Sequence, residues 1–231
     1  MEMQLTTDSS KIYLDQKPFF IQGMNLFLDP FPLEKDPKHI YTPQVASADL
    51  IRKIIPHLHK AHINTVRIWP TIIEKTEHRP AIEDEGIFLL QDAGMKIIMN
   101  LPNNWHQILP LSQTRTFFDK FGESSFENII IYCLANEVYY AGILPKSYLD
   151  ALNRLFKSIS TRLTLVTNAN LVFPFYSGTD IVGADFFTYK YSISRNGNED
   201  VGAVAKMWLQ DTEKDLKFFP KLTYTLYNNL M

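Results

Sequence analysis

The segment Ile129-Ile130-Ile131-Tyr132-Cys133-Leu134-Ala135-Asn136-Glu137 decides the fold, because a nearly apolar run passes directly into an amide and a carboxylate. A strand that is apolar at every position is buried on both faces, which is typical of a parallel sheet covered by helices. The pattern therefore predicts a buried strand over 129–134. In a (β/α) barrel, the polar pair that follows such a strand lies where catalytic groups gather.

The same pattern recurs along the chain, with apolar runs alternating with helical periods. Further strands are expected at 63–69, 95–101, 163–167, 181–189 and 221–226. Helices are expected from Ser47 and over 85–93, 116–121, 148–159 and 201–216. This alternation predicts an α/β fold, and the number of strands favours a TIM (β/α)8-type barrel over an open sheet. No glycine-rich phosphate loop follows the first strand, so the fingerprint of a dinucleotide-binding fold is missing.

The ends of the chain differ from this pattern. Residues 12–21 predict a β-hairpin, because two short apolar runs flank a polar turn that contains Pro18. Four prolines between residues 28 and 43 predict a loop. Eight (β/α) units usually take about 250 residues. The 231 residues therefore predict one barrel domain over 1–231 that is truncated after about strand 7 and incomplete at its C-terminus.

Composition excludes several classes of protein. The net charge of −2 argues against a nucleic-acid binder, which needs a basic stripe. The single cysteine, Cys133, excludes an intrachain disulfide and a cysteine-cluster zinc site, and it is expected to be an inert core residue. No metal, cofactor or membrane partner is expected, and no oligomeric state is specified. The polar N-terminus predicts a cytoplasmic location, since it has no secretory apolar region.

Polar residues that follow the apolar runs are the candidate site. They are Asn25, Arg67, Trp69, the stretch 103–105, Asn136, Glu137, Asn168 and the stretch 185–191. Amides, an arginine, a glutamate and tryptophans at successive strand ends are the groups that bind the hydroxyls and faces of sugars. A carboxyl group that is partly desolvated at the mouth of a barrel has a raised pKa and can donate a proton, and this is the role expected of Glu137. The alternative for Glu137 is a solvated residue that opens a loop.

For the other candidate residues, a purely structural role is an alternative to a functional one. Arg67 inside a barrel needs a carboxylate partner, or else it reaches solvent past the strand end. Trp69 and Trp105 fit a stacking platform and a core position equally well. Three histidines at helical spacing indicate a helix surface, and the last of them is expected to help end the helix: His57, His59 and His62.

The chain resembles the retaining glycoside hydrolases of clan A, in particular the cellulase- and mannanase-like enzymes of family 5. The segments that carry the resemblance are 12–25, 63–67, 93–99, 103–105 and 134–137, and they span most of the chain to about Tyr191. The resemblance implies that Glu137 is the general acid/base and that Asn136 binds the sugar 2-hydroxyl. It also implies that Arg67 orients the nucleophile and that Asn104 and Trp105 line the sugar subsites.

The chain departs from this family at the second carboxylate, which retaining hydrolysis requires. The expected seventh strand, 221–227, contains no Asp or Glu. Glu199 lies in a polar loop and Glu213 near the end of a helix. On the sixth strand, Asp185 is the spare carboxylate, and only Tyr189 can replace the tyrosine that the family often has there. Little or no retaining turnover is therefore expected.

Three readings of function follow. The first is a glycosidase acting on β-linked oligo- or polysaccharides, and the second is a catalytically inactive relative that still binds carbohydrate. The third is a truncated remnant that folds poorly because strand edges stay unpaired. A barrel with a different chemistry is a further alternative, because one fold hosts many functions.

Overall fold

The computed structural model describes residues 5–8, 11–26, 45–74, 77–102, 109–136, 145–169 and 178–185. Three expected elements lie outside these residues: the proline-rich loop at 28–43, the helix at 201–216 and the strand at 221–226.

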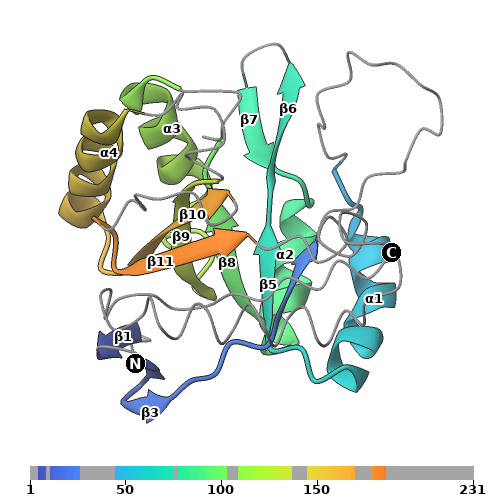
Figure 1. Cartoon of the computed structure of the whole chain (residues 1–231). Helices are drawn as coiled ribbons and strands as arrows, with labels where there is room; N and C mark the ends of the chain where they lie inside the picture. Colours follow the sequence, from blue (N-terminus) through green and yellow to red (C-terminus); the bar gives the residue numbers. More distant parts are fainter. Residues whose placement is uncertain are drawn as a thin grey trace, which may run out of the picture.

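Six parallel strands form the central sheet and pair in chain order, as Figure 1 shows. They are β4 (Gly23–Leu26), β5 (Thr65–Ile68), β8 (Lys96–Asn100), β9 (Ile129–Ala135), β10 (Leu163–Ala169) and β11 (Ile181–Asp185). Val66 pairs with Ile97 in parallel register, as the buried-strand pattern requires. The predicted α/β barrel-type fold is confirmed, and β4 and β11 form the two edges of the sheet among the described residues.

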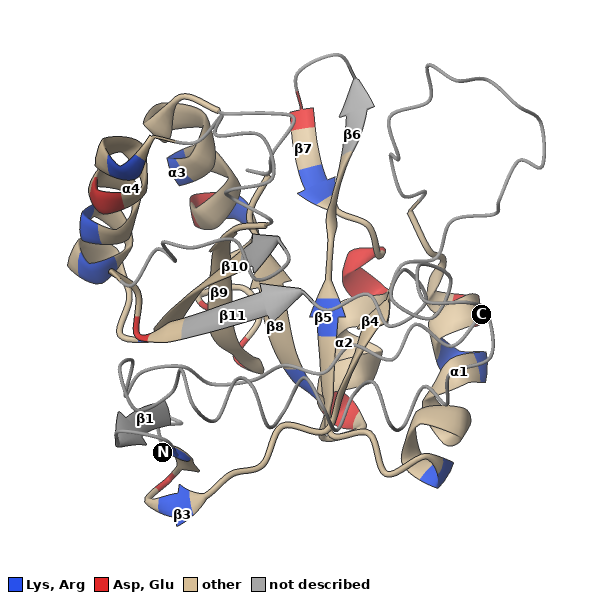
Figure 2. Ribbon diagram, viewed as in Figure 1, with Lys and Arg blue, Asp and Glu red and all other residues tan. Residues whose placement is uncertain are grey.

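Helices connect the first five of these strands. They are α1 (Ala48–Lys60), α2 (Asp84–Asp92), α3 (Leu111–Phe121) and α4 (Lys146–Ile159). Ser47 caps α1 as expected, because its hydroxyl accepts a hydrogen bond from the amide of Leu50. In Figure 2, helices α1 and α4 carry several charged residues, drawn in blue and red, whereas strands β8 and β9 carry almost none. No helix in the described part of the chain is long and apolar enough to cross a bilayer.

Two hairpins lie outside the parallel sheet. The strand before Pro70 ends at Ile68, and Pro70 itself begins β6 (Pro70–Glu74), which pairs with β7 (Glu77–Pro80). Proline is tolerated at the first residue of a strand because its missing N–H is not needed there. The hairpin at the N-terminus is confirmed, with β1 (Leu5–Asp8) added to β2 (Lys11–Leu14). Its second arm, β3 (Lys17–Pro18), begins earlier than the predicted run of 19–21.

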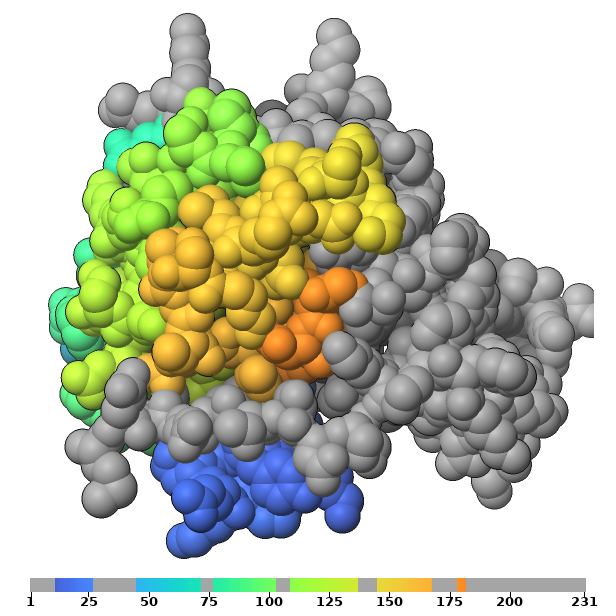
Figure 3. Space-filling model, turned by 90° about the vertical axis from the view of Figure 1, so that its left-hand side faces the viewer, coloured from blue at the N-terminus to red at the C-terminus, as the bar shows by residue number. Residues whose placement is uncertain are grey.

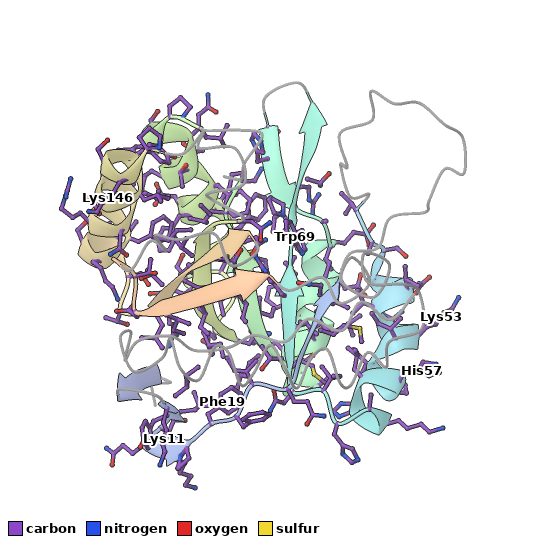
Figure 4. All side chains as sticks on the ribbon, in the orientation of Figure 1. Lys11, Phe19, Lys53, His57, Trp69 and Lys146 are labelled. Carbon is purple, nitrogen blue, oxygen red and sulfur yellow. The ribbon has the colours of Figure 1, made fainter. Side chains whose placement is uncertain are left out.

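The parallel sheet has two apolar faces with different partners. Its outer face packs against the four helices. On its inner face, residues such as Ile98, Leu163 and Leu165 join a separate cluster with Ile12 and Phe19 of the hairpin region. Figure 3 shows the blue N-terminal segment at the base of the molecule, where Figure 4 labels Phe19. The hairpin therefore covers the amino-terminal end of the barrel interior with apolar side chains.

Helices α1 and α2 end in the same motif with different residues. His62 has φ of 57° and Gly94 has φ of 75°, and both occupy the left-handed position after the helix. The amide of His62 donates a hydrogen bond to the carbonyl oxygen of His59, and the amide of Ile63 donates one to the carbonyl oxygen of Leu58. This is the Schellman pattern, so His62 ends its helix as expected.

These two helix ends predict a pair of opposite stability effects. His62→Gly is expected to raise the free energy of unfolding by about 0.5–1 kcal/mol, because glycine adopts positive φ without a steric penalty. Gly94→Ala is expected to lower the free energy of unfolding by about 1 kcal/mol, because alanine pays a steric penalty at positive φ. A Cβ at Gly94 would meet no atom within 4 Å, so the effect would come from the backbone conformation and not from a clash. Urea unfolding of both variants measures these changes. Stabilisation by Gly94→Ala would contradict the assignment.

Candidate functional site

The inner face of the sheet changes from apolar to polar along the barrel axis. The register pairs Asn25 of β4 with Arg67 of β5, and Arg67 with Ile98 of β8. Two residues beyond Ile98, Asn100 returns to the same face, since side chains alternate along a strand. The polar groups therefore gather at the carboxyl end of the sheet, opposite the hairpin.

Arg67 lies at the centre of these polar groups. Its side chain is buried, with only 2% of the residue's surface exposed, so the alternative of an arginine that reaches solvent is wrong. The Nε atom donates to Asn100 Oδ1 at 2.6 Å, and Nη2 donates to Asn136 Oδ1 at 2.7 Å. A buried charge is costly unless its donors are satisfied, so these amides hold the guanidinium in one orientation.

Cys133 belongs to the same cluster. It is buried as predicted, but it is not isolated in the core, because its Sγ lies 3.1 Å from Arg67 Nη2 as a hydrogen-bond acceptor. The thiol also lies 3.4 Å from the carbonyl oxygen of Ala135. The expectation that Cys133 only packs in the core is therefore wrong, because its thiol contacts the buried guanidinium of Arg67.

A β-bulge brings Asn136 into the interior. Leu165 of β10 pairs with Cys133, whereas the next residue, Val166, pairs with Ala135, so β9 contains one extra residue. Leu134 and Ala135 both pack in the outer core as a result. The extra residue reverses the alternation of side chains, and Asn136 therefore faces the same way as Cys133.

Residues from three strands meet at one atom at the carboxyl end of the sheet. Asn136 follows β9, which lies beside β10 and two strands away from β5. Its Oδ1 accepts hydrogen bonds both from Arg67 Nη2 and from Thr167 Oγ1, the latter at 2.8 Å. The long side chain of Arg67 and the short side chain of Thr167 therefore reach the same oxygen from two different strands.

Trp69 lies above this cluster, at the upper end of the sheet in Figure 4. The guanidinium carbon of Arg67 lies 4.8 Å from the centre of its ring, within the range of a cation–π contact. Its indole Nε1 points to Asn25 Oδ1 at 3.4 Å. Trp69 is half-buried, so it is packed on Arg67 and still partly open to a ligand.

The structure thus brings four of the predicted site residues together: Asn25, Arg67, Trp69 and Asn136. Asp185 ends β11 and pairs in register with Ala169 of β10, so its backbone lies at the carboxyl end of the sheet. The remaining predicted residues lie outside the described part of the chain: Asn104, Trp105, Glu137 and Tyr189. The three histidines are exposed, and no group of metal-ligating side chains occurs among the described residues.

Sequence reasoning missed Asn100 and Thr167. Each lies near the carboxyl end of an apolar run, two residues after an apolar side chain of the inner face, Ile98 for Asn100 and Leu165 for Thr167. The alternation of side chains along each strand could therefore have identified both residues. The prediction instead named Asn103 and Asn168, the first amides found after each run.

No protein-family model matches the sequence, and no curated protein sequence matches it. Solved structures share the fold. A β-glucuronidase 2 of Bacteroides uniformis, covalently bound to cyclophellitol-6-carboxylate aziridine, is 17% identical with a TM-score of 0.62, over 96% of this chain and 26% of that one. A β-glucuronidase of Ruminococcus gnavus, in complex with an N1-substituted uronic isofagomine, is 14% identical with a TM-score of 0.64, over 97% of this chain and 37% of that one.

This chain therefore spans 26% and 37% of the lengths of those two enzymes. At this level of identity the likeness establishes the fold alone, which this chain shares with those two enzymes. It does not extend to activity.

Proposed function

We propose that the chain is a glycosidase-like protein that binds a β-linked oligo- or polysaccharide at the carboxyl end of its parallel sheet. The observation that carries the proposal is the hydrogen bond from buried Arg67 to Asn136 Oδ1. It fixes the residue that directly precedes Glu137. In this proposal Glu137 is the general acid/base, as the family 5 resemblance implies.

The chemistry of the described cluster suits a sugar. An amide presents both donors and acceptors, which pair with hydroxyl groups, and an indole face packs on the apolar face of a pyranose. Arg67 is buried beneath Trp69, so we assign it the role of holding Asn136 and Trp69 in place. Asn104, Trp105 and Tyr189 complete the subsites in this proposal.

A carbohydrate-binding protein without turnover is the second candidate. It is favoured by the stretch 221–227, which contains no Asp or Glu where a nucleophile is expected. Asp185 is then the spare carboxylate. Its carboxyl group would serve as nucleophile at about 5.5 Å from that of Glu137, and as an inverting base at about 6.5–9.5 Å.

The test measures hydrolysis and binding on the same preparations. Release of reducing sugar is followed with β-mannan and β-glucan, and release of the aglycone with an aryl β-glucuronide. Loss of a general acid typically costs 10²–10⁴-fold in rate, so Glu137→Gln is expected to reduce any turnover by at least about 100-fold while retaining binding.

Asp185→Asn separates the two candidates. Equal loss of turnover in both variants supports a two-carboxylate enzyme. Binding without turnover in the unmodified chain supports the second candidate. Absence of both binding and turnover with all three substrates would contradict the proposal.

A further inference from the structure

Among the described residues, the hydrogen bonds to the side-chain amide of Asn136 are all made to its oxygen. Arg67 Nη2 lies 2.7 Å from Oδ1, and Thr167 Oγ1 lies 2.8 Å from the same atom. A guanidinium can only donate, so the atom that it contacts must be the amide oxygen and not the nitrogen. The orientation of the amide is therefore determined by its chemical partners, with Nδ2 on the side away from both donors.

The two donors have different properties. Arg67 Nη2 is shared between Asn136 Oδ1 and Cys133 Sγ, and the guanidinium also depends on Asn100 for its own position. Thr167 is fully buried within β10, and a β-branched side chain has restricted χ1, so its hydroxyl is fixed by the strand itself. A single hydrogen bond leaves an amide free to rotate about that bond, whereas two donors from different strands, β5 and β10, restrict this rotation.

We propose that Thr167 is a positioning residue, which acts through Asn136 so that Nδ2 is directed at an acceptor oxygen of the ligand. This inference rests on the proposed function for the identity of that ligand, a sugar hydroxyl. Thr167 itself is fully buried, so the role proposed for it is exerted through Asn136. The bulge in β9 makes the arrangement possible, because it places Asn136 on the inner face beside Thr167.

The first arm of the test uses the protein without any sugar. The side-chain amide signal of Asn136 is assigned by NMR from its disappearance in Asn136→Asp. Thr167→Val removes the hydroxyl at nearly constant shape and is expected to broaden or shift that signal through exchange between orientations. Thr167→Ser keeps a donor and is expected to restore it. An unchanged signal in Thr167→Val would overturn the inference.

The second arm measures binding of the oligosaccharide found in the hydrolysis and binding assay, together with its 2-deoxy analogue. Loss of one hydrogen bond corresponds to about tenfold in Kd, so unmodified protein is expected to prefer the 2-hydroxyl compound by about tenfold. In Thr167→Val this preference is expected to fall to about two- to threefold. A retained tenfold preference would count against the positioning role.

The matched control is Thr116→Val on the outer face of α3, where an exposed hydroxyl bonds to the carbonyl of Ser112. This variant is expected to keep both the amide signal and the tenfold preference. If unmodified protein binds no sugar, the proposed function fails, and the NMR arm still decides the role of Thr167.

Discussion

Phe156→Ala is expected to lower the free energy of unfolding by about 4 kcal/mol, the largest stability effect anticipated in the described part of the chain. Phe156 lies on α4 and is fully buried. Its ring meets Phe118 of α3 edge-on at 5.2 Å and Tyr132 of β9 at 5.4 Å. Removing the ring leaves a cavity between two helices and the sheet, and it also removes these aromatic contacts.

Urea or thermal unfolding measures this effect, and the melting temperature should fall by about 8–16 °C for a domain of this size. Phe88→Ala is the matched control, because Phe88 also lies on a helix and contacts one ring, Phe126, at 5.3 Å. Phe88 is 46% exposed, so its loss is expected to cost only about 1 kcal/mol. Equal effects of the two substitutions would show that the ring cluster is not the centre of the core.

Arg67→Lys is expected to weaken oligosaccharide binding by at least about 100-fold with little change in net charge. Lysine has one ammonium group in place of a planar fork, so it cannot bond Asn100 Oδ1 and Asn136 Oδ1 with the same geometry. Each hydrogen bond to a charged group is worth about 1.5–3 kcal/mol, and losing one of them also releases Asn136 or Trp69. Isothermal titration calorimetry with the oligosaccharide measures the loss.

The control for this substitution is Arg52→Lys on the outer face of α1. Arg52 bonds Asp49 at 2.5 Å and Glu85 at 3.1 Å, and its side chain is 53% exposed. Exposed ion pairs contribute little, so affinity is expected to remain within about twofold. Unchanged binding in Arg67→Lys would show that the buried guanidinium does not organise the binding site.

The order and direction of the elements could be predicted because burial leaves a periodic signal in the sequence. The continuous apolar run at 129–134 specifies a strand buried on both faces, and β9 is one. Serine before a helical period specifies a cap, and Ser47 is one. These signals are local, so they did not predict the hairpin of β6 and β7, which begins at Pro70 directly after β5.

The pattern of apolar runs is sufficient to identify the polar residues that follow buried strands, and hence to place Asn25, Arg67 and Asn136 at one end of a parallel sheet. Which of their atoms meet depends on the tertiary structure. The bulge between Cys133 and Ala135 turns the side chain of Asn136 to the inner face, and the local alternation of side chains does not predict it. The pairing of β5, β9 and β10 in one sheet then allows Arg67 and Thr167 to reach the same oxygen. Both depend on contacts between residues far apart in the chain, where local periodicity carries no information.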